Sequence, residues 1–544
     1  MTQRINRNAI PIIDLFAGPG GMSEGFARYP FDNPQETIFR TSLGVEACDK
    51  AHATLTLRHF THQFPSDSLP NEYYETLQKL TKPTFQSELE ATRELYDRFG
   101  EEAQLAKDSA LCEKLGIGTR GKIARRIKRA VEHKKHWVLL GGPPCQAFSN
   151  AGVSRNKGIE GYELNSDHRT YLYQEFVHVL KKQLPSVFVM ENVPGMLACK
   201  IAGKSISKRI WTDLSNPEGL KKRNPKKRYR LFSLSTGKPA NINDSEETGK
   251  DFVVRMENYG VPQARHRVII LGIREDLELN ELPMTLNSAV PNTCLEDVIA
   301  DLPELRSGLS KDDTPENWIK AISKLRLSAW YKRPQKKHKA TIQLIKETLN
   351  KLLVPDSDRG QNWSHYSTSP RAKKLKHWYS DPKLKGTLNH TTKMHMASDL
   401  HRYLFATCFA KEGEENKSPL LSDFPQQLLP EHKNVQQALI KKTLGQVGFK
   451  DRFTVQLPDK PASTITSHLH KDGHKFIHYD PKQCRAITPR EAARIQTFPD
   501  NYYFCGGQSA SYLQIGNAVP PVLSHQIAEI VEAVLRKAQA GSSY

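Results

Sequence analysis

The sequence lacks several patterns that mark whole classes of protein. Its eight cysteines are scattered and include no C-x-x-C pair; they stand at positions 48, 112, 145, 199, 294, 408, 484 and 505. This spacing offers neither a structural zinc site nor a disulfide framework, which agrees with a reducing cytosol. No uncharged apolar run approaches the roughly 20 residues of a membrane-spanning helix, and the apolar run near the N-terminus is interrupted by Asp14. We therefore expect a soluble cytoplasmic protein with no metal site and no membrane contact.

Basic residues are in excess among what is present. The 544 residues include 79 lysines and arginines against 59 aspartates and glutamates, which gives a formal net charge of +20. Such a balance suits an acidic partner, and a nucleic-acid backbone is the commonest one. A basic soluble protein without such a partner is the plain alternative, which charge does not exclude. The length corresponds to roughly three to four domain-sized units, or to one large domain with insertions.

Short apolar runs alternate with longer polar segments in the first half of the chain. The runs occupy residues 11–16, 41–47, 136–142, 186–192, 252–258 and 266–273. Most are rich in β-branched residues and nearly uninterrupted, which is typical of strands that helices cover on both faces. The alternation predicts an α/β domain with a doubly wound sheet. Ligands of such folds bind just beyond the carboxyl ends of the strands.

Two polar insertions interrupt this alternation. Residues 63–135 end in "GKIARRIKRAVEHKKH", and residues 200–250 include "KKRNPKKRYR". A charge run is usually a solvated helix or loop, but with a nucleic-acid substrate it becomes a candidate for phosphate contact. From about 275 to 460 the strand-like runs thin out, and basic residues interleave with aromatic ones. That composition suits phosphate contact and base stacking, and it equally suits an ordinary basic region.

Two helices are predicted towards the C-terminus. Thr488, Pro489 and Glu491 form a capping box with proline at the first helical position, which predicts a helix that starts at Pro489. Residues 520–539 carry an apolar stripe at helical spacing, which should dock on the α/β domain. The stripe consists of Val522, Leu523, Ile527, Ile530, Val531 and Leu535.

The motif "IIDLFAGPGGMSEGF" (12–26) runs from a strand through a glycine-rich turn into a helix. Glycines let the backbone approach a ligand closely, and the start of a helix offers free N–H groups. A complete G-x-G-x-x-G is absent, so a dinucleotide is not favoured, and a glycine-rich turn alone is often only a turn. Glu46 ends the next strand, where an acidic residue can hold ribose hydroxyls. Together these features predict a nucleoside-bearing cofactor that needs no phosphate contact.

Cys145 stands in "LLGGPPCQAFSNAG" (139–152), directly after Gly-Gly-Pro-Pro. Pro143 and Pro144 restrict φ and remove two backbone donors, so the strand cannot continue as a normal ladder. A free cysteine is more often a small buried hydrophobe. Because this turn instead presents the thiol at the carboxyl end of a strand, we interpret Cys145 as a nucleophile.

Two further motifs place ionisable groups at strand ends. Glu191 follows the apolar strand in "VFVMENVPGML" (187–197), where a solvent-exposed glutamate is the plain alternative to a functional one. Arg265 and Arg267 alternate into a buried strand in "YGVPQARHRVIILG" (259–272) and should face one side. Paired arginines suit a carboxylate or phosphate partner, and they also suit a structural salt bridge.

Taken together and in this order, the segments resemble the C5-cytosine DNA methyltransferase family. The matching pieces are "DLFAGPGG", "GGPPCQAFS", "ENVPGML", "QARHR", "RAITPREAARIQTFPD" and "IGNAVPP", which span residues 12–521. The resemblance implies the S-adenosylmethionine-dependent methyltransferase fold, a doubly wound mixed sheet with a smaller target recognition domain inserted. It implies a catalytic and cofactor-binding domain at 1–275, a target recognition domain at 276–480, and a C-terminal segment at 481–544 that returns to the catalytic domain.

The resemblance also implies a mechanism and a set of site residues. Cys145 would attack C6 of a cytosine flipped out of duplex DNA, and Glu191 would hydrogen-bond N3 and the exocyclic amine. Arg267, with Arg265 beside it, would hold Glu191 and the base in place. C5 would then take the methyl group of S-adenosylmethionine in a covalent mechanism that divides one difficult step in two. The implied cofactor residues are Phe16, Gly18, Pro19, Gly20, Gly21, Glu46, Ala47, Pro144, Asn517, Ala518 and Val519.

One family feature has no clear counterpart, an aspartate after the third strand that contacts the adenine. In residues 55–67, where it is expected, only Asp67 is available.

We expect a monomer that acts on double-stranded DNA as the modification half of a bacterial restriction–modification system, with a cognate restriction endonuclease as its partner. Two other functions stay open: RNA cytosine methylation on the same fold, and nucleic-acid binding without catalysis. The large inserted region favours duplex DNA, because reading its sequence needs elements that reach the grooves. The intact Cys145, Glu191 and Arg267 favour catalysis.

Overall fold

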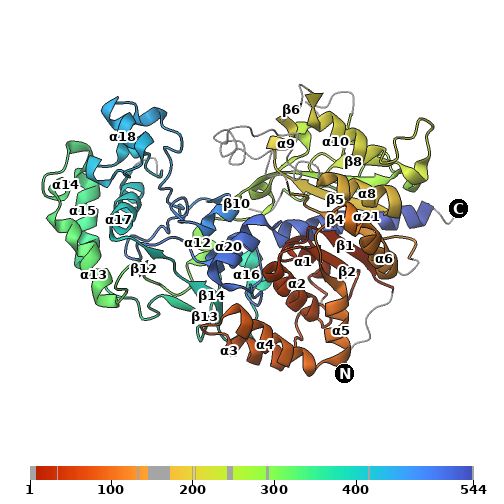
Figure 1. The fold of residues 1–544 in the computed structure, drawn as a ribbon, viewed down its shortest axis with the longest axis horizontal. Helices are drawn as coiled ribbons and strands as arrows, with labels where there is room; N and C mark the ends of the chain where they lie inside the picture. The colour runs from red at the N-terminus through yellow and green to blue at the C-terminus, as the bar shows by residue number, and fades with distance from the viewer. Residues whose placement is uncertain are drawn as a thin grey trace. The chain divides into compact units, whose positions relative to one another are not determined.

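A computed structural model shows two compact units (Figure 1). Unit 1 comprises Met1–Thr76, Phe85–Asn292 and Ala518–Tyr544, and unit 2 comprises Leu77–Thr84 and Thr293–Asn517. The structure describes residues 8–33, 35–131, 134–144, 172–198, 200–201, 204–241, 249–288, 293–413 and 417–541. Unit 1 holds the large β-sheet, and unit 2 is built mainly from helices.

One mixed sheet forms the centre of unit 1. Its strands are β1 (Ile10–Leu15), β2 (Phe39–Glu46), β3 (Ala110–Cys112), β4 (Val138–Gly141), β5 (Val187–Asn192), β8 (Tyr229–Ser233), β9 (Val253–Arg255) and β11 (His266–Arg274). They lie in the order β3-β2-β1-β4-β5-β11-β8, and β9 pairs with the start of β11. The first five are parallel, whereas β11 runs antiparallel to both β5 and β8. The predicted doubly wound mixed sheet is confirmed.

Helices cover both faces of this sheet (Figure 1). The main ones are α1 (Gly21–Ala27), α6 (Arg120–Val131), α8 (Tyr173–Gln183), α10 (Ile206–Ser215) and α21 (Pro521–Gly541). Successive strand residues point to opposite faces. Ile12 of β1 therefore joins an apolar cluster with Phe26 of α1 and Leu523 of α21, which we call the first cluster. Ile13 joins a second cluster with Phe176 of α8.

The last helix packs closely against α1, as the apolar stripe predicted. Five of the six stripe residues are buried in the first cluster, namely Leu523, Ile527, Ile530, Val531 and Leu535. Gly25 of α1 permits the close approach, because a β-carbon there would lie 2.4 Å from the backbone oxygen of Pro521. Residues from the two ends of the chain therefore share one core.

The 63–135 insertion contains folded elements. Helices α3 (Asn71–Lys79), α4 (Phe85–Asp97) and α5 (Gly100–Ser109) precede β3 and α6 in the chain. The sequence pattern did not predict β3, because a strand of only 3 residues is too short to show an apolar run. It did not predict β8 because this strand directly follows the basic run of the second insertion, yet Tyr229, Leu231 and Phe232 are nearly or fully buried in the sheet.

Unit 2 has an apolar core of its own. Helices α13 (Pro315–Ser323), α15 (Lys339–Asn350) and α17 (Ala397–Glu412) contribute Trp318, Ile345 and Phe405 to it. No helix in the described part of the chain is long and apolar enough to cross a membrane.

The predicted capping box is present in unit 2 at the start of α19 (Pro489–Ile495). The hydroxyl of Thr488 accepts from the Glu491 backbone N–H at 3.2 Å, and Oε2 of Glu491 accepts from the Thr488 N–H at 2.7 Å. Residues 481–517, which include α19, belong to unit 2, and residues 518–544 belong to unit 1 with the sheet. The assignment of 276–480 to target recognition stays a prediction.

Candidate active site at the carboxyl edge of the sheet

Four parallel strands end together at what we call the carboxyl edge of the sheet. β1, β2, β4 and β5 end at Leu15, Glu46, Gly141 and Asn192. The glycine-rich turn, the Gly-Gly-Pro-Pro turn and Glu191 therefore follow or end neighbouring strands. Because β11 is antiparallel to β5, its start lies at the same edge and brings Arg267 there.

The glycine-rich turn after β1 is tied directly to Glu46. The backbone N–H groups of Gly18 and Cys48 donate to the two carboxylate oxygens of Glu46, at 2.9 and 2.8 Å. Gly18 and Gly20 have φ values of 58° and 97°, the left-handed region that glycine adopts without strain. A β-carbon on Gly18 would have no atom within 4 Å, so the turn borders open space.

Glu191 and Arg267 form an ion pair. Nε of Arg267 lies 2.9 Å from Oε1 of Glu191, and the two side chains are only 14% and 13% exposed. Arg267 also donates from Nη1 to the backbone oxygen of His266 at 2.7 Å. Such a charge-assisted contact holds the carboxylate in one orientation. The alternative of a solvent-exposed glutamate at the strand end is therefore wrong.

The turn that precedes Cys145 lies against this ion pair. A β-carbon on Gly142 would lie 3.2 Å from Oε2 of Glu191. Nδ2 of Asn192 donates to the backbone oxygen of Pro143 at 3.3 Å, which joins the ends of β4 and β5. Cys145 itself lies outside the described residues.

Comparison with known proteins decides the family. The C-5 cytosine-specific DNA methylase family matches residues 114–212 and 249–533, which is more than half of the chain. The chain belongs to the C-5 cytosine-specific DNA methylase family. It is accordingly a DNA (cytosine-5-)-methyltransferase, and the resemblance found in its motifs is confirmed.

Relatives of this methyltransferase cover most of its length. The type II methyltransferase M.Bpa9945I of Bacillus paralicheniformis is 28% identical over 96% of this chain and 99% of its own. M.DdeI of Desulfomicrobium norvegicum is 26% identical over 72% and 71%. The DNA (cytosine-5-)-methyltransferase M.ApeKI of Aeropyrum pernix is 24% identical over 73% and 81%. Among solved structures, the Entamoeba histolytica methyltransferase EhMeth is 12% identical over 97% and 99%, with a TM-score of 0.40.

Arg265 of the methyltransferase lies behind the ion pair. It is 1% exposed, and its Nη2 donates to the backbone oxygen of Ala518 at 3.0 Å. Burial lowers its pKa, Arg267 lowers it further, and Glu191 opposes both. Arg265 therefore interacts electrostatically with both members of the ion pair. Its hydrogen bond to Ala518 also connects the strands of this pair to the segment before α21. Val519, the next residue of that segment, is buried in the first cluster.

Asp14 of β1 is a buried acid to which the sequence analysis gave no role. It is 2% exposed, and burial raises its pKa to about 7, against the opposing effect of hydrogen bonds with Ser23. Its Oδ2 has no hydrogen-bond partner among the residues that the structure describes. Ser23 also donates from Oγ to the backbone oxygen of Gly20 at 3.1 Å, so Asp14 is linked to the glycine-rich turn. The only sequence signal was an acid within an apolar strand.

The other predicted cofactor residues are spread over four segments and both units. Pro19 and Gly21 are buried in or next to the turn, Ala47 is exposed after β2, and Pro144 is partly buried after β4. Phe16 directly follows β1, with φ 58°. Asn517 is exposed and ends α20 (Gly507–Asn517), which belongs to unit 2. Their contact with a cofactor stays a prediction.

Asp67 does not follow a strand. Residues Asp49–Thr61 form α2, and the third strand along the chain is β3. The acid directly after β3 is Glu113, whose backbone N–H donates to the Glu46 oxygen at 3.0 Å and whose Oε2 lies 2.6 Å from Nζ of Lys122. Within the described ranges, no three acidic, His or Cys side chains are grouped to hold a metal ion.

Proposed function

We propose that this methyltransferase transfers the methyl group of S-adenosylmethionine to C5 of a cytosine flipped out of a specific duplex DNA sequence. The intermediate is a covalent bond between Sγ of Cys145 and C6. The observation that carries the proposal is the Glu191–Arg267 ion pair against the turn before Cys145. The ion pair orients the Glu191 carboxyl group against the turn that leads to the predicted nucleophile, which supports Glu191 as the partner for the ring nitrogen of a bound base.

The protein side chains act in sequence on the flipped base. The Cys145 thiolate bonds to C6, and the electron pair of the C5–C6 double bond moves to C5. The carboxyl group of Glu191 donates a proton in a hydrogen bond to N3, and its other oxygen accepts from the exocyclic amine, which favours this addition while Arg267 holds the carboxyl group in place. C5 then takes the methyl group, its proton is lost to solvent, and reformation of the double bond expels the thiolate. Addition and elimination replace one difficult displacement.

The turn after β1 and the end of β2 fit the cofactor. Open space borders Gly18, and the Glu46 carboxylate stands beside it at the carboxyl edge, where ribose hydroxyls bind in such folds. S-adenosylmethionine supplies an electrophilic methyl group on its sulfonium centre. Phe16, Gly20 and Val519 belong to the same predicted cofactor set.

The biological setting is part of the proposal. A target atom inside duplex DNA is reached only by flipping the base, at a cost of about a few kcal/mol. The printed names of the relatives, type II methyltransferases, support a modification role in a restriction–modification system. We propose a cytoplasmic monomer whose partners are duplex DNA and, in the same system, a cognate restriction endonuclease.

A covalent trap tests the chemistry. Duplex DNA that carries 5-fluorocytosine at the methylated position should form a stable adduct with the wild-type chain, because fluorine cannot leave C5 as the proton does. Cys145→Ala should form no adduct and methylate nothing, yet bind S-adenosylmethionine normally by calorimetry. Cys294→Ala, which removes a partly exposed free cysteine of unit 2, is the matched control and should behave as wild type. Methylation by Cys145→Ala would refute the mechanism.

The substrate is tested by sequencing. Methylated cytosines in a bacterial host that expresses the chain should fall in one duplex recognition sequence. Methyl transfer to transfer RNA but not to duplex DNA would overturn the assignment of the substrate.

A further inference from the structure

A set of cations lies at the edge of the sheet opposite to the carboxyl edge. β4 and β5 begin there, and antiparallel β11 ends there at Arg274. Helices α6 and α8 end at the same edge, because each leads into the strand that follows it. Six basic residues at these chain reversals form what we call the basic edge: Lys128, Arg129, Lys134, Lys135, Lys181 and Lys182.

Hydrogen bonds hold the segments of the basic edge side by side. The backbone N–H of Ser186 donates to the Trp137 oxygen at 3.1 Å, and the Ser186 hydroxyl donates to the Lys135 oxygen at 3.5 Å. Arg274 donates from Nη1 to the backbone oxygen of Leu184 at 2.6 Å. The lysines before β4 and those before β5 therefore project from one connected surface.

The charge of this surface is not balanced locally. None of the six cations forms an ion pair with an acid in the part of the chain that the structure describes. Farther along the same edge, by contrast, Arg223 pairs with Glu275 at 2.9 Å and Lys227 with Glu218 at 3.0 Å. At the basic edge itself, Asp276 pairs with Arg274 at 2.7 Å and with none of the six cations.

The cations of this surface contribute to lowered pKa values of two neighbouring histidines. Burial lowers the pKa of His136, Lys135 and Arg274 lower it further, and Asp276 opposes them. Burial also lowers the pKa of His178 on α8; Arg120 lowers it further, Glu175 opposes this effect, and Lys182 and Lys181 add to the lowering.

A structural role accounts for only some of these cations. Lysines and arginines in the last turn of a helix complement its dipole, which applies to Lys128 and Arg129 of α6 and to the lysines that end α8. Lys134 and Lys135 lie between α6 and β4, outside any helix. Helix capping therefore does not explain why they extend the same patch.

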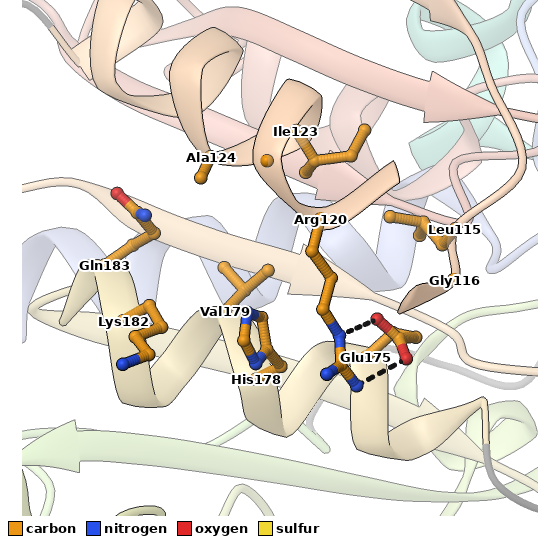
Figure 2. A pocket seen from close by; sticks show the side chains of 11 residues that line it. Leu115, Gly116, Arg120, Ile123, Ala124, Glu175, His178, Val179, Lys182 and Gln183 are labelled. Carbon is orange, nitrogen blue, oxygen red and sulfur yellow. Dashed lines mark hydrogen bonds and ion pairs between the residues drawn. The ribbon is translucent and has the colours of Figure 1, made fainter. Parts of the chain in front are cut away.

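The groove between α6 and α8 shows the same contrast between paired and unpaired charge (Figure 2). It has a volume of about 320 Å³. Arg120 and Glu175 close one end with two hydrogen bonds of 2.9 and 2.8 Å. Lys182 lies farther along α8, away from that pair, beside Gln183.

We propose that the basic edge binds the phosphate backbone of a second segment of duplex DNA while the carboxyl edge holds the segment being methylated. β5 is 6 residues long, so the two edges are about 17–20 Å apart along the strands. Duplex DNA resists bending over lengths below about 150 bp. A short duplex in the active site therefore cannot reach the basic edge, whereas a long DNA molecule folds back to it.

The second contact has a kinetic consequence. An enzyme that releases one segment while it holds another stays on the same molecule, because the effective concentration of neighbouring sites is high. The inference rests on the proposed function only in taking duplex DNA as the substrate.

The test uses the full chain with its active site already filled. Wild-type protein trapped on a 20-bp duplex with 5-fluorocytosine should still bind a second, unmodified 200-bp duplex in a gel-shift assay. The variant Lys134→Glu/Lys135→Glu/Lys181→Glu/Lys182→Glu should form the trap but lose the second binding by at least about tenfold. The matched variant with arginine at all four positions should keep it. If trapped wild-type protein binds no second duplex, the proposal is wrong.

Salt dependence and substrate length give independent readouts. For long DNA, the slope of log affinity against log salt should fall by about 3–4 in the glutamate variant, since each phosphate contact contributes about 0.9. KM should rise about tenfold on kilobase DNA and stay unchanged on the 20-bp duplex. An equal loss on both lengths would refute the proposal, as would second-site binding of RNA or polyglutamate in preference to duplex DNA. Failure of wild-type protein to form the trap would count against the proposed function instead, while the salt slope on long DNA still tests the basic edge.

Discussion

Replacing Asp14 by asparagine should make the protein more stable, and increasingly so as the pH rises. Asp14 is almost fully buried, its Oδ2 has no partner among the described residues, and burial raises its pKa from 3.8 to about 7. Below pH 3.8 the carboxyl is protonated in both the folded and the unfolded state. Between these two values only the folded protein keeps the proton, so the stability of the wild type falls as the pH rises.

The size of the effect follows from the two pKa values. A difference of one in pKa corresponds to about 1.4 kcal/mol, so the wild type loses up to about 4 kcal/mol of stability through Asp14 between pH 4 and pH 8. Asparagine keeps an oxygen for the Ser23 hydroxyl and mimics the protonated acid. Asp14→Asn should therefore match wild type near pH 4 and exceed it by up to about 4 kcal/mol at pH 8.

The measurement must report on unit 1 alone. Hydrogen exchange by mass spectrometry in increasing urea, on peptides from β1 and β4, follows the unfolding of the sheet separately from unit 2. Asp67→Asn, at an exposed loop position, controls for the removal of one carboxylate. A stability difference between Asp14→Asn and wild type that stays constant from pH 4 to pH 8 would refute the reasoning.

Three further substitutions have defined outcomes. Arg58→Ala leaves the fully buried Glu24 without its bidentate partner, at 2.7 Å for one of the bonds, so urea unfolding should show a loss of about 3–5 kcal/mol at pH 7. Because Arg58 holds the pKa of Glu24 well below its usual range against burial, that stabilisation should decline progressively as the pH falls from about 4 towards the lowered pKa. Arg267→Ala should lower kcat on duplex DNA by at least about 100-fold through the loss of orientation of Glu191, with an unchanged Kd for S-adenosylmethionine; a weaker cofactor affinity would point to a different role. Leu523→Ala should destabilise unit 1 by about 2–5 kcal/mol, seen as earlier exchange of the β1 peptides, whereas a loss below 1 kcal/mol would mean that α21 contributes little to the core.

The sheet and its site could be predicted where the local pattern and the tertiary environment agree. The runs around β1, β4 and β11 are largely apolar, because helices cover both faces of these strands. The capping box at Thr488 is complete within four residues, so the start of α19 could be predicted from the local sequence without knowledge of tertiary contacts. The apolar residues of α21 likewise recur at helical spacing, so this helix could also be predicted from the local sequence.

The rest depended on contacts between distant segments. β8 has the basic run before it, and its assignment to the sheet follows from pairing with β11 rather than from its own sequence. β3 is too short for a periodic signal, and for that reason Glu113 could not be recognised as the acid after the third strand. The bond between Gly18 and Glu46 joins residues 28 positions apart, and no local rule specifies that geometry.

The shared core of α1 and α21 also sets an order of events during synthesis. Unit 1 begins with β1 but receives its last helix only after all of unit 2, from Thr293 to Asn517, has been made. At about 5–20 residues per second the ribosome needs about 10–45 s for that stretch. Throughout that time, the apolar face that α21 will cover stays incomplete, and unit 2 is whole before α21 has been made. A chain that stops before α21 therefore lacks part of the apolar core on which β1 packs.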